Sequence, residues 1–326
     1  SGSATFNAAL TVTGELNLSG SGTIKFSMGS GTNTQNTTVG NFSCGDDFSG
    51  TIQFGNYASD AILSGEDSFI VSNGGISIPE NTSISMAGVI TSSQNQVFGG
   101  TVTLLYYVKL TAPTVEFKNS ITSSSNIGAK NINITGNAIF NANVSTTGDI
   151  SVSGTTTING GNISITTTNY LTDIANQSYT GAVILGATTT TFSSLGNITF
   201  GSTIDGKTEN AQNLTISAHN GTTKKAITFT GAVGSTVPLG KVTVNYGTAT
   251  ANGAFSAQSL EITSNAKFTP AASSIVTLAG DFTNNGTFTH NNSTVVFTDD
   301  ATISGSSTFY NLTAATGGKT LTVSDT

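Results

Sequence analysis

This sequence predicts an all-β fold and, more narrowly, a parallel β-solenoid, in which successive turns of the chain stack in the same direction. The first observation is that short runs rich in β-branched residues alternate apolar and polar positions, as strands with one buried face do. The second is a loose repeat, because residues 22–26 (GTIKF) return as residues 50–54 (GTIQF), 28 positions later. The third is that no run has the length or spacing of an ordinary helix.

Residues 181–247 show the repeating unit most clearly. Runs of β-branched residues, most of them bounded by Gly, Asn or Ser, recur about every 13 to 16 residues. These runs cover residues 182–185, 197–200, 213–216, 226–229 and 241–246. Phe200 and Phe229 lie 29 positions apart, as do Phe268 and Phe297, which extends the loose repeat along the chain. Repeats of this length are typical of solenoids and other repeat arrays.

The alternation starts at the first residues and weakens in one region. Residues 1–55 open directly on a strand pattern, whereas residues 56–120 are the least regular part. Pro79 and Pro113 interrupt that second region. Because proline cannot donate to a strand ladder, we expect both at strand starts or corners. Residues 170–177 (YLTDIANQ) are the one candidate for a helical turn.

One run is apolar beyond simple alternation. Residues 102–110 (VTLLYYVKL) contain a Leu pair and a Tyr pair, and such doubling places apolar groups on both faces of a strand. We expect a loop from the same region to cover the outer face, because an exposed apolar strand promotes aggregation. The alternative is that this run forms a surface for a partner or for assembly. At nine residues, it is far too short to span a bilayer.

The composition limits the classes of partner. Only 8% of the 326 residues are charged, against roughly 25% in an average globular domain. All ten basic residues are lysines, Lys224 and Lys225 form the one basic pair, and the net charge is −7. Binding to phosphate backbones requires clusters of basic residues, so we expect neither nucleic acid as a partner nor insertion into a membrane. Cys44 is the single cysteine, which rules out an internal disulfide.

These patterns favour a solenoid with an inner ladder of aliphatic and Phe side chains and an outer ladder of Thr, Ser and Asn. We expect residues 1–326 to form one continuous segment of this kind, less regular around residues 56–120, within a longer chain. With roughly 20 to 30 residues per turn and about 4.8 Å of rise per turn, such a segment is a rod of roughly 50 to 80 Å. An open terminal turn presents unpaired backbone groups, which predicts end-to-end stacking.

Three phrases resemble a known class of proteins. Residues 197–206 (NITFGSTIDG), 213–218 (NLTISA) and 227–240 (ITFTGAVGSTVPLG) resemble the repeats of large filamentous-haemagglutinin-like bacterial surface proteins. The composition is also similar to that of autotransporter passengers. The resemblance is fair over residues 180–250 and diffuse elsewhere. It implies a right-handed parallel β-helix, secretion to the cell surface and a role in adhesion.

A search for catalytic motifs returns little. His219 and His290 are the two histidines, far apart in sequence, and no metalloprotease, nucleophile-elbow or phosphate-loop motif is present. A nucleophilic role for Cys44 with a distant histidine is chemically allowed, but a small side chain in a turn explains it better. The acidic groupings, which more often cap turns or solvate loops, are Asp46–Asp47, Asp60 with Glu66 and Asp67, and Asp299–Asp300. We therefore expect no catalytic, cofactor-binding or metal-binding residues.

The sequence thus predicts a non-enzymatic structural or adhesive segment of a secreted or cell-surface fibrous bacterial protein. The expected partners are other copies of the chain, stacked end to end, or neighbouring surface proteins; a glycan or protein of a host or cell surface is a further expected ligand. Two alternatives remain. One is a self-assembling subunit of a sheath, surface layer or filament. The other is a carbohydrate-active enzyme on a β-helix, which requires paired carboxylates on one lateral face.

Overall fold

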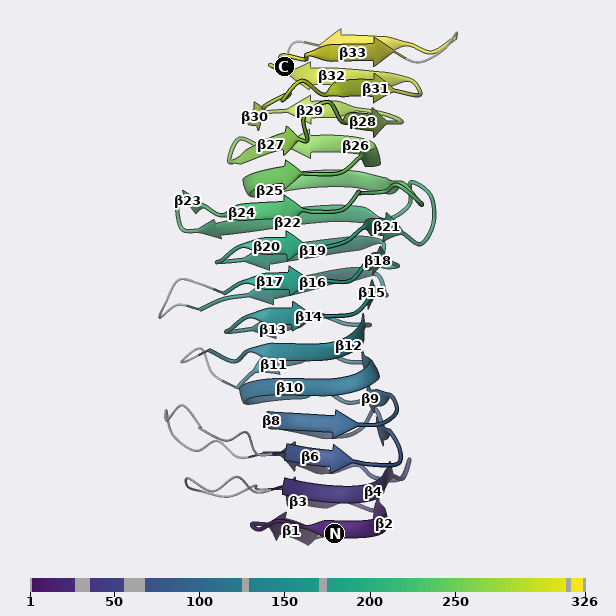
Figure 1. Ribbon diagram of the computed structural model, residues 1–326, viewed down its shortest axis with the longest axis vertical. Helices are drawn as coiled ribbons and strands as arrows, with labels where there is room; N and C mark the ends of the chain where they lie inside the picture. Colours follow the sequence, from purple (N-terminus) through teal and green to yellow (C-terminus); the bar gives the residue numbers. More distant parts are fainter. Residues whose placement is uncertain are drawn as a thin grey trace. The chain divides into compact units, whose positions relative to one another are not determined.

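The computed structural model describes residues 2–26, 36–55, 68–124, 129–169, 175–314 and 318–324. These residues form 34 strands and no helix, arranged as a parallel β-solenoid of about 14 turns (Figure 1). The predicted fold class is therefore confirmed. The candidate helical turn at residues 170–177 lies outside the described residues except for its last three positions.

The chain divides into two compact units, unit 1 with residues 1–154 and 169–172, and unit 2 with residues 155–168 and 173–326. The strands of unit 1 are β1 (Gly2–Phe6), β2 (Thr11–Leu18), β3 (Gly22–Phe26), β4 (Asn36–Cys44), β5 (Thr51–Phe54), β6 (Ser68–Val71), β7 (Ile76–Ile78), β8 (Ser83–Ser92), β9 (Gln96–Phe98), β10 (Val102–Phe117), β11 (Ile121–Ser123), β12 (Ile132–Phe140), β13 (Val144–Thr146) and β14 (Ile150–Val152).

Unit 2 contains the remaining strands, which are β15 (Thr156–Ile158), β16 (Asn162–Thr167), β17 (Gln177–Tyr179), β18 (Val183–Leu185), β19 (Thr189–Ser194), β20 (Ile198–Phe200), β21 (Ile204–Gly206), β22 (Asn213–Asn220), β23 (Thr223–Lys224), β24 (Ala226–Phe229), β25 (Leu239–Ala251), β26 (Phe255–Ile262), β27 (Ala266–Pro270), β28 (Ile275–Leu278), β29 (Phe282–Asn284), β30 (Thr287–Phe288), β31 (Thr294–Phe297), β32 (Ala301–Gly305), β33 (Asn311–Ala314) and β34 (Leu321–Ser324).

Each turn passes through three parallel sheets, which we call faces A, B and C in each unit separately. In unit 2, face A stacks β16, β19, β22, β25, the end of β26, β29, β32 and β34. Face B stacks β17, β20, β24, the end of β25, β27 and β30. Face C stacks β15, β18, β21, the start of β26, β28, β31 and β33, with Val233 bridging β21 to β26.

Unit 1 follows the same plan. Face A runs from β1 through β3, β5 and the starts of β8 and β10 to β11 and β13. Face B contains β6, the end of β8, the middle of β10, the start of β12 and β14, and face C contains β7, β9 and the ends of β10 and β12. A long strand such as β10 therefore bends through all three faces, as its curved ribbon shows (Figure 1).

Aromatic rings stack along the interior because like residues pair in register. Phe6, Phe26 and Phe54 stack on face A of unit 1, with ring centroids 5.4 and 5.7 Å apart. On face B of unit 2, the stack is Tyr179, Phe200 and Phe229, with both separations 5.4 Å. Fully burying one such side chain contributes about 1.5–3 kcal/mol, so these stacks are major determinants of stability.

The predicted repeat holds at two places and fails at a third. Thr23 pairs with Thr51, which confirms the 28-residue offset, and Phe200 pairs with Phe229, which confirms the 29-residue offset. The equal spacing of Phe268 and Phe297 is misleading, because Phe268 pairs with Phe288 on face B whereas Phe297 pairs with Leu278 on face C. The physical reason is that corner lengths differ between turns.

Asparagine and aspartate at the corners bind successive turns together. Asn176 Oδ1 accepts the N–H of Asn197 (2.9 Å), and Asn197 Oδ1 accepts the N–H of Ala226 (3.0 Å) one turn further on. The same contact joins Asn213 to Lys241 and Asp281 to Thr302, at 2.8 Å each. These side chains supply acceptors where the strand ladder is interrupted, which gives asparagine and aspartate a structural role at these corners.

A glycine often precedes the residue that donates to this asparagine. A Cβ built on Gly196 comes within 2.5 Å of Asn176 Oδ1, and one built on Gly240 comes within 2.5 Å of Asn213 Oδ1. Real Cβ atoms do not approach so closely, so the corner requires a residue without a side chain. Glycine and asparagine therefore occur together at corners for a steric reason.

The region from β7 to β10 agrees with one expectation and corrects another. Pro79 lies between β7 and β8, and Pro113 lies where the pairing of β10 with β12 shifts register, so both are at corners as predicted. The paired Leu and Tyr residues of 102–110 do not cover two faces of one strand. Leu105, Tyr106 and Tyr107 form the bend between faces A and B, where the pairing of β10 with β8 shifts, and all three are half-buried.

Candidate interaction surfaces

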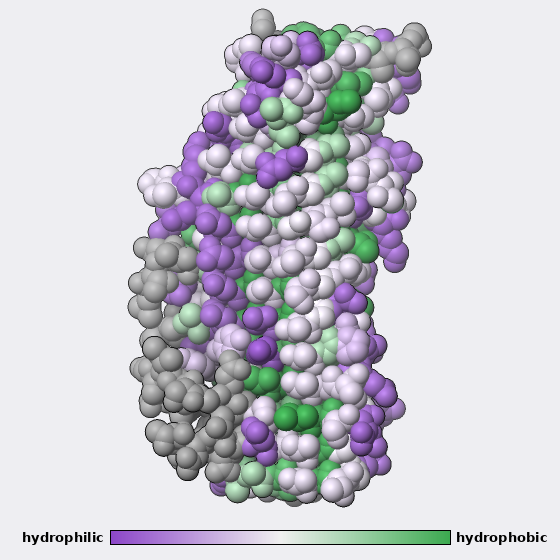
Figure 2. Space-filling model, viewed as in Figure 1, coloured by the Kyte–Doolittle hydropathy of each residue, from purple (hydrophilic) through white to green (hydrophobic). Residues whose placement is uncertain are grey.

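Rows of hydroxyl groups cover the outside of the sheets. On face B of unit 2, Ser178, Thr199, Thr228, Thr250 and Thr269 are register partners in successive turns, and we call them the face B hydroxyl row. Figure 2 shows the visible surface as mostly near-white side chains of intermediate hydropathy, the range to which Thr and Ser belong. Such a surface offers many hydrogen-bond donors and acceptors with few charges.

Face A of unit 2 carries a second hydroxyl row, formed by Ser164, Thr191, Thr215 and Thr243. In unit 1, the corresponding outward positions of face A hold Ser85, Thr103, Thr122 and Ser145. These rows agree with the outer ladder of Thr, Ser and Asn expected from the alternation, but the sequence did not show which hydroxyls share a row. A row takes one hydroxyl from each turn, and the register that aligns them is set by pairing between distant residues.

A short hairpin interrupts the parallel stacking of unit 2. β22 continues beyond face A and pairs antiparallel with β23, so that His219 faces Lys224 and Asn220 faces Thr223. We call residues 219–225 the lysine hairpin. It is the one antiparallel pairing among the described strands, and it projects sideways from the stack (Figure 1). Residues 221–224 are exposed, so the hairpin adds little to the core.

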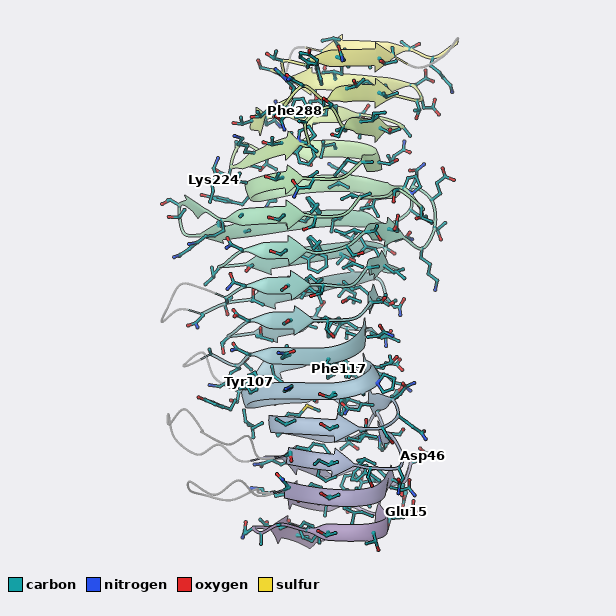
Figure 3. The ribbon with its side chains drawn as sticks, viewed as in Figure 1. Glu15, Asp46, Tyr107, Phe117, Lys224 and Phe288 are labelled. Atoms are coloured by element: carbon teal, nitrogen blue, oxygen red, sulfur yellow. The ribbon has the colours of Figure 1, made fainter. Side chains whose placement is uncertain are left out.

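Contacts with the following turn hold this hairpin. The His219 ring lies on the Tyr246 ring, with centroids 4.1 Å apart, and Tyr246 Oη donates a hydrogen bond to the Thr222 carbonyl (3.2 Å). At its base, Lys225 N–H donates to the Ala218 carbonyl (2.9 Å). Figure 3 shows Lys224 at the outer edge, away from the stacked interior in which Phe288 lies. The hairpin is thus an ordered element that presents charged side chains to solvent.

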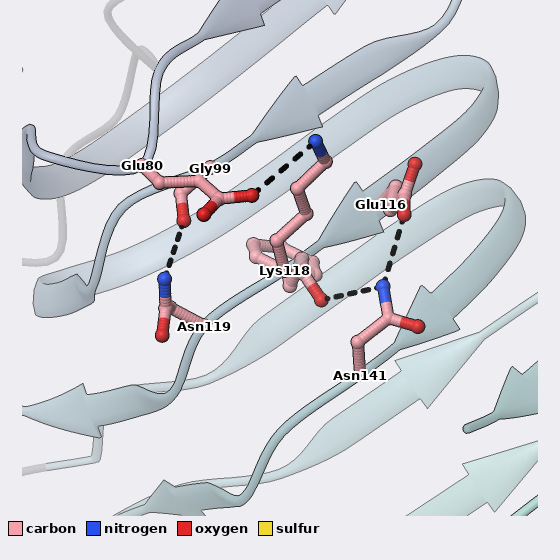
Figure 4. A network of polar contacts seen from close by, with 7 residues as sticks. Glu80, Gly99, Glu116, Lys118, Asn119 and Asn141 are labelled. Carbon is pink, nitrogen blue, oxygen red and sulfur yellow. Dashed lines mark hydrogen bonds and ion pairs between the residues drawn. The ribbon is translucent and has the colours of Figure 1, made fainter. Parts of the chain in front are cut away.

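A polar cluster occupies the corner between faces C and A in unit 1 (Figure 4). Lys118 forms an ion pair with Glu80 (3.6 Å), and Asn119 Nδ2 donates to the Gly99 carbonyl (2.7 Å). In the next turn, Asn141 Nδ2 donates to Glu116 Oε1 (2.9 Å). The ion pair is largely exposed, so it contributes at most about 1 kcal/mol. These contacts join turns, and each polar group in them already has a partner.

The acidic groupings have ordinary surroundings wherever they are described. Asp299 forms an ion pair with Lys319 (2.6 Å), and this hydrogen-bonded contact lowers the pKa of the Asp299 carboxyl. Asp300 Oδ1 accepts the N–H of Thr320 (2.7 Å), in the manner of the corner residues above. Asp60, Glu66 and Asp67 lie outside the described residues. Within the described part of the chain, no three His, Cys, Asp or Glu side chains form a group that could hold a metal ion.

Cys44 and the two histidines are also described. Cys44 is half-buried, and its burial, together with the charges of Asp47 and Asp46, raises the pKa of the thiol to about 11. The thiol is therefore protonated at neutral pH and is a weak nucleophile. His290 stacks on Tyr310 with centroids 5.8 Å apart, as His219 does on Tyr246, so each histidine is a ring-stacking residue in this structure.

Sequence reasoning noted the Lys224–Lys225 pair but missed the hairpin that carries it. Asn220–Gly221 directly precedes Thr222, and an Asn-Gly dipeptide between strand patterns is a strong hairpin signal. Gly221 indeed has a positive φ of 54°. The signal was present in the sequence, but the contact of His219 with Tyr246 joins neighbouring turns and has no local signature.

Comparison with models of protein families finds no match to this chain. Comparisons with curated proteins and with solved structures also find none. Among the described residues there is no helix of the length and apolar character needed to cross a membrane. The surfaces described above are therefore interpreted from their own chemistry.

Proposed function

We propose that this chain is a non-enzymatic structural and adhesive segment of a secreted or cell-surface fibrous bacterial protein. The observation that supports it best is the set of outward hydroxyl rows on a parallel solenoid. A surface of Thr and Ser side chains can form many weak hydrogen bonds to hydroxyl-rich ligands such as surface glycans. Backbone pairing of every turn with the next gives the segment its rigidity without a large globular core.

The composition supports the same proposal. A surface with few charges depends little on salt and pH, which suits a protein that works outside the cell. The corner asparagines and aspartates use their side chains to join turns, so they serve mechanical continuity. The filamentous-haemagglutinin-like resemblance of residues 197–206, 213–218 and 227–240 agrees with this role.

The test is a bead assay with the purified chain. Beads coated with the folded chain should adhere to cells or to immobilised cell-surface glycans, and beads coated with heat-denatured chain should not. The same preparation should leave those glycans uncleaved, as measured by the release of reducing ends. Equal adhesion by both kinds of bead would contradict the adhesive role, and cleavage of the glycan would favour the enzyme alternative.

Self-assembly is a second candidate, favoured by one observation. Leu312 and Val323 are 44% and 72% exposed, although they pair in register with the buried residues Val295 and Ile303. A further parallel strand, from the chain itself or from a second copy, would cover these apolar positions, and the test below distinguishes the two. Sedimentation over a concentration series should then show growth of the particles, and Leu312→Lys with Val323→Lys should abolish that growth. A monomer at every concentration would contradict this candidate.

A further inference from the structure

We propose that the lysine hairpin and the face B hydroxyl row together bind a linear polysaccharide that carries anionic groups. This inference rests on the adhesive part of the proposed function and names its ligand class and its site. It depends on three features of unit 2, namely lysines without an ion pair, the absence of acids among the described residues beside them, and the alignment of hydroxyl groups.

The lysines at this corner are free to bind an external anion. Lys118, Lys241 and Lys319 are occupied by Glu80, Glu261 and Asp299 in ion pairs. Lys224, Lys225 and Lys267 form no ion pair with any described residue. Lys267 lies on the same side of the stack as the hairpin. It is in one register column with Thr248 and with Ala226, the residue that follows Lys225. Two strand spacings separate Ala226 from Lys267, about 10 Å.

Among the described residues around these lysines, we find no acidic side chain in the corners and face B strands of five successive turns. The corners and face B strands of five successive turns cover residues 195–200, 219–229, 245–251, 263–270 and 285–288, and none of them includes Asp or Glu. In a chain of net charge −7, this makes the corner a local region of positive potential. An anionic ligand is attracted here and repelled from more acidic parts of the surface.

The hydroxyl row selects a sugar polymer over other anions. Thr199, Thr228 and Thr250 present one hydroxyl per turn beside the hairpin, along the direction in which the turns stack. A linear polysaccharide lying along this direction can donate hydrogen bonds to the row while its anionic groups reach the lysines. The exposed large apolar side chains among the described residues are Ile275, Tyr310, Leu312 and Val323, and none lies on this surface, which disfavours a protein partner.

The hairpin is also pre-organised for binding. The stack of His219 on Tyr246 and the hydrogen bond from Tyr246 Oη to Thr222 hold its backbone before any ligand arrives. Ordering this segment on binding therefore costs little conformational entropy. Lysine binds anions as a point charge without bidentate geometry, so each contact is weak and sensitive to salt, and affinity comes from several contacts along the polymer.

The test measures binding of the chain to three immobilised polymers. These are polygalacturonate, which carries carboxylates, dextran sulfate, which carries sulfates, and fully methyl-esterified polygalacturonate, which is neutral. We expect binding to at least one anionic polymer and little binding to the neutral ester. The binding to the anionic polymer should be lost at about 0.5 M salt, because screening is strong there. The comparison of the first two polymers identifies the anionic group. Equal binding to the neutral ester would overturn the proposal.

Matched variants locate the site. Lys224→Gln with Lys225→Gln should weaken binding about tenfold, since two charge-assisted contacts are lost. Lys25→Gln with Lys207→Gln removes the same charge from exposed lysines that lie outside the proposed surface and should leave binding unchanged. The Lys224→Arg with Lys225→Arg variant, which keeps both charges, should bind the polymer as the unaltered chain does. If the two double glutamine variants lost polymer binding equally, the effect would be one of overall charge, and the proposed location of the site would be wrong.

Two further arms test the hydroxyl row and the ligand class. Thr228→Val with Thr250→Val should weaken binding, whereas Thr191→Val with Thr215→Val on face A should not. Double-stranded DNA bound as tightly as the anionic polysaccharides would mean a general polyanion surface and would overturn the sugar assignment. If the Lys224→Gln with Lys225→Gln variant adheres to cells as well as the unaltered chain does, the proposed site is wrong, although the adhesive role still stands.

Discussion

Two successive turns of unit 2 pass from face A to face B by different routes. After β19, three residues, 195–197, make a tight corner in which Gly196 N–H donates to the Ala175 carbonyl and Asn197 N–H donates to Asn176 Oδ1. In the next turn, the seven residues of the lysine hairpin, which begins within β22, replace that corner. Both routes deliver a phenylalanine to the same stack, since Phe200 and Phe229 lie 5.4 Å apart with their rings 7° from parallel.

The difference separates what the solenoid requires from what it permits. The tight corner leaves no room for a Cβ and satisfies its backbone groups through the preceding turn, so its residues are dictated by the stack. The hairpin is exposed and satisfies its backbone by pairing with itself and with Tyr246. Corners of this second kind can vary in length and sequence without disturbing the interior, which makes them natural carriers of binding residues.

The largest predicted effect tests whether both turns depend on the same interior. Phe200→Ala and Phe229→Ala should each lower the free energy of unfolding by about 3–5 kcal/mol, because each leaves a cavity in a buried stack. Denaturant unfolding measures this, with the outward Thr199→Ala as a control expected to cost less than about 1 kcal/mol. A cost below about 1 kcal/mol for Phe229→Ala would mean that the hairpin turn is loosely packed.

The next effect tests the tight corner itself. Gly196→Ala should lower the free energy of unfolding by about 2–3 kcal/mol, because its Cβ collides with Asn176 Oδ1 and with the backbone of Ala175. Gly161 has no atom within 4 Å of a built Cβ, so Gly161→Ala is the matched control and should be neutral or slightly stabilising. Equal effects of the two substitutions would refute the steric account of this corner.

A smaller effect runs in the opposite direction. Thr190 on β19 is buried with no hydrogen-bond partner for its hydroxyl, whereas its register partner on β22 is Leu214. Thr190→Val should therefore raise the free energy of unfolding by about 1 kcal/mol, because it removes an unsatisfied polar group without changing the shape. Thr191→Val, on the outer side of the same strand, should change it by less than about 0.5 kcal/mol. A destabilised Thr190→Val variant would indicate a buried partner for that hydroxyl.

The smallest effect is expected at the hairpin. Lys224→Gln with Lys225→Gln should change the free energy of unfolding by less than about 0.5 kcal/mol, because both side chains are free of ion pairs with described residues and Lys224 is exposed. Thermal melts of this variant and of the unaltered chain should coincide. A clear loss of stability would place the hairpin among the structural corners and would remove the contrast between the two routes.

Much of the architecture was predictable from local pattern. The runs at residues 197–200 and 226–229 correspond to β20 and β24 within one residue, and the alternation correctly assigned Ile198 and Phe200 to the interior. The strand at residues 213–216 was predicted too short, because β22 continues to Asn220 in the hairpin. The bend at Leu105–Tyr107 was interpreted as a two-sided strand because a corner that remains in extended conformation has the same sequence pattern as a strand.

The sequence by itself determined the features that depend on neighbouring residues. Alternation divides each strand into an inner and an outer side, and the scarcity of charged residues leaves hydroxyl and amide side chains on the outside. The tertiary structure alone decided which positions stack on which. Ile84 pairs with Val102, 18 positions on, whereas Thr51 pairs with Ser83, 32 positions on. Corners of different lengths are accommodated outside the stack, so the spacing of residues along the chain does not fix their register. The sequence therefore predicted outward hydroxyls, whereas the membership of each row and the lysine corner became visible only when the turns were laid on one another.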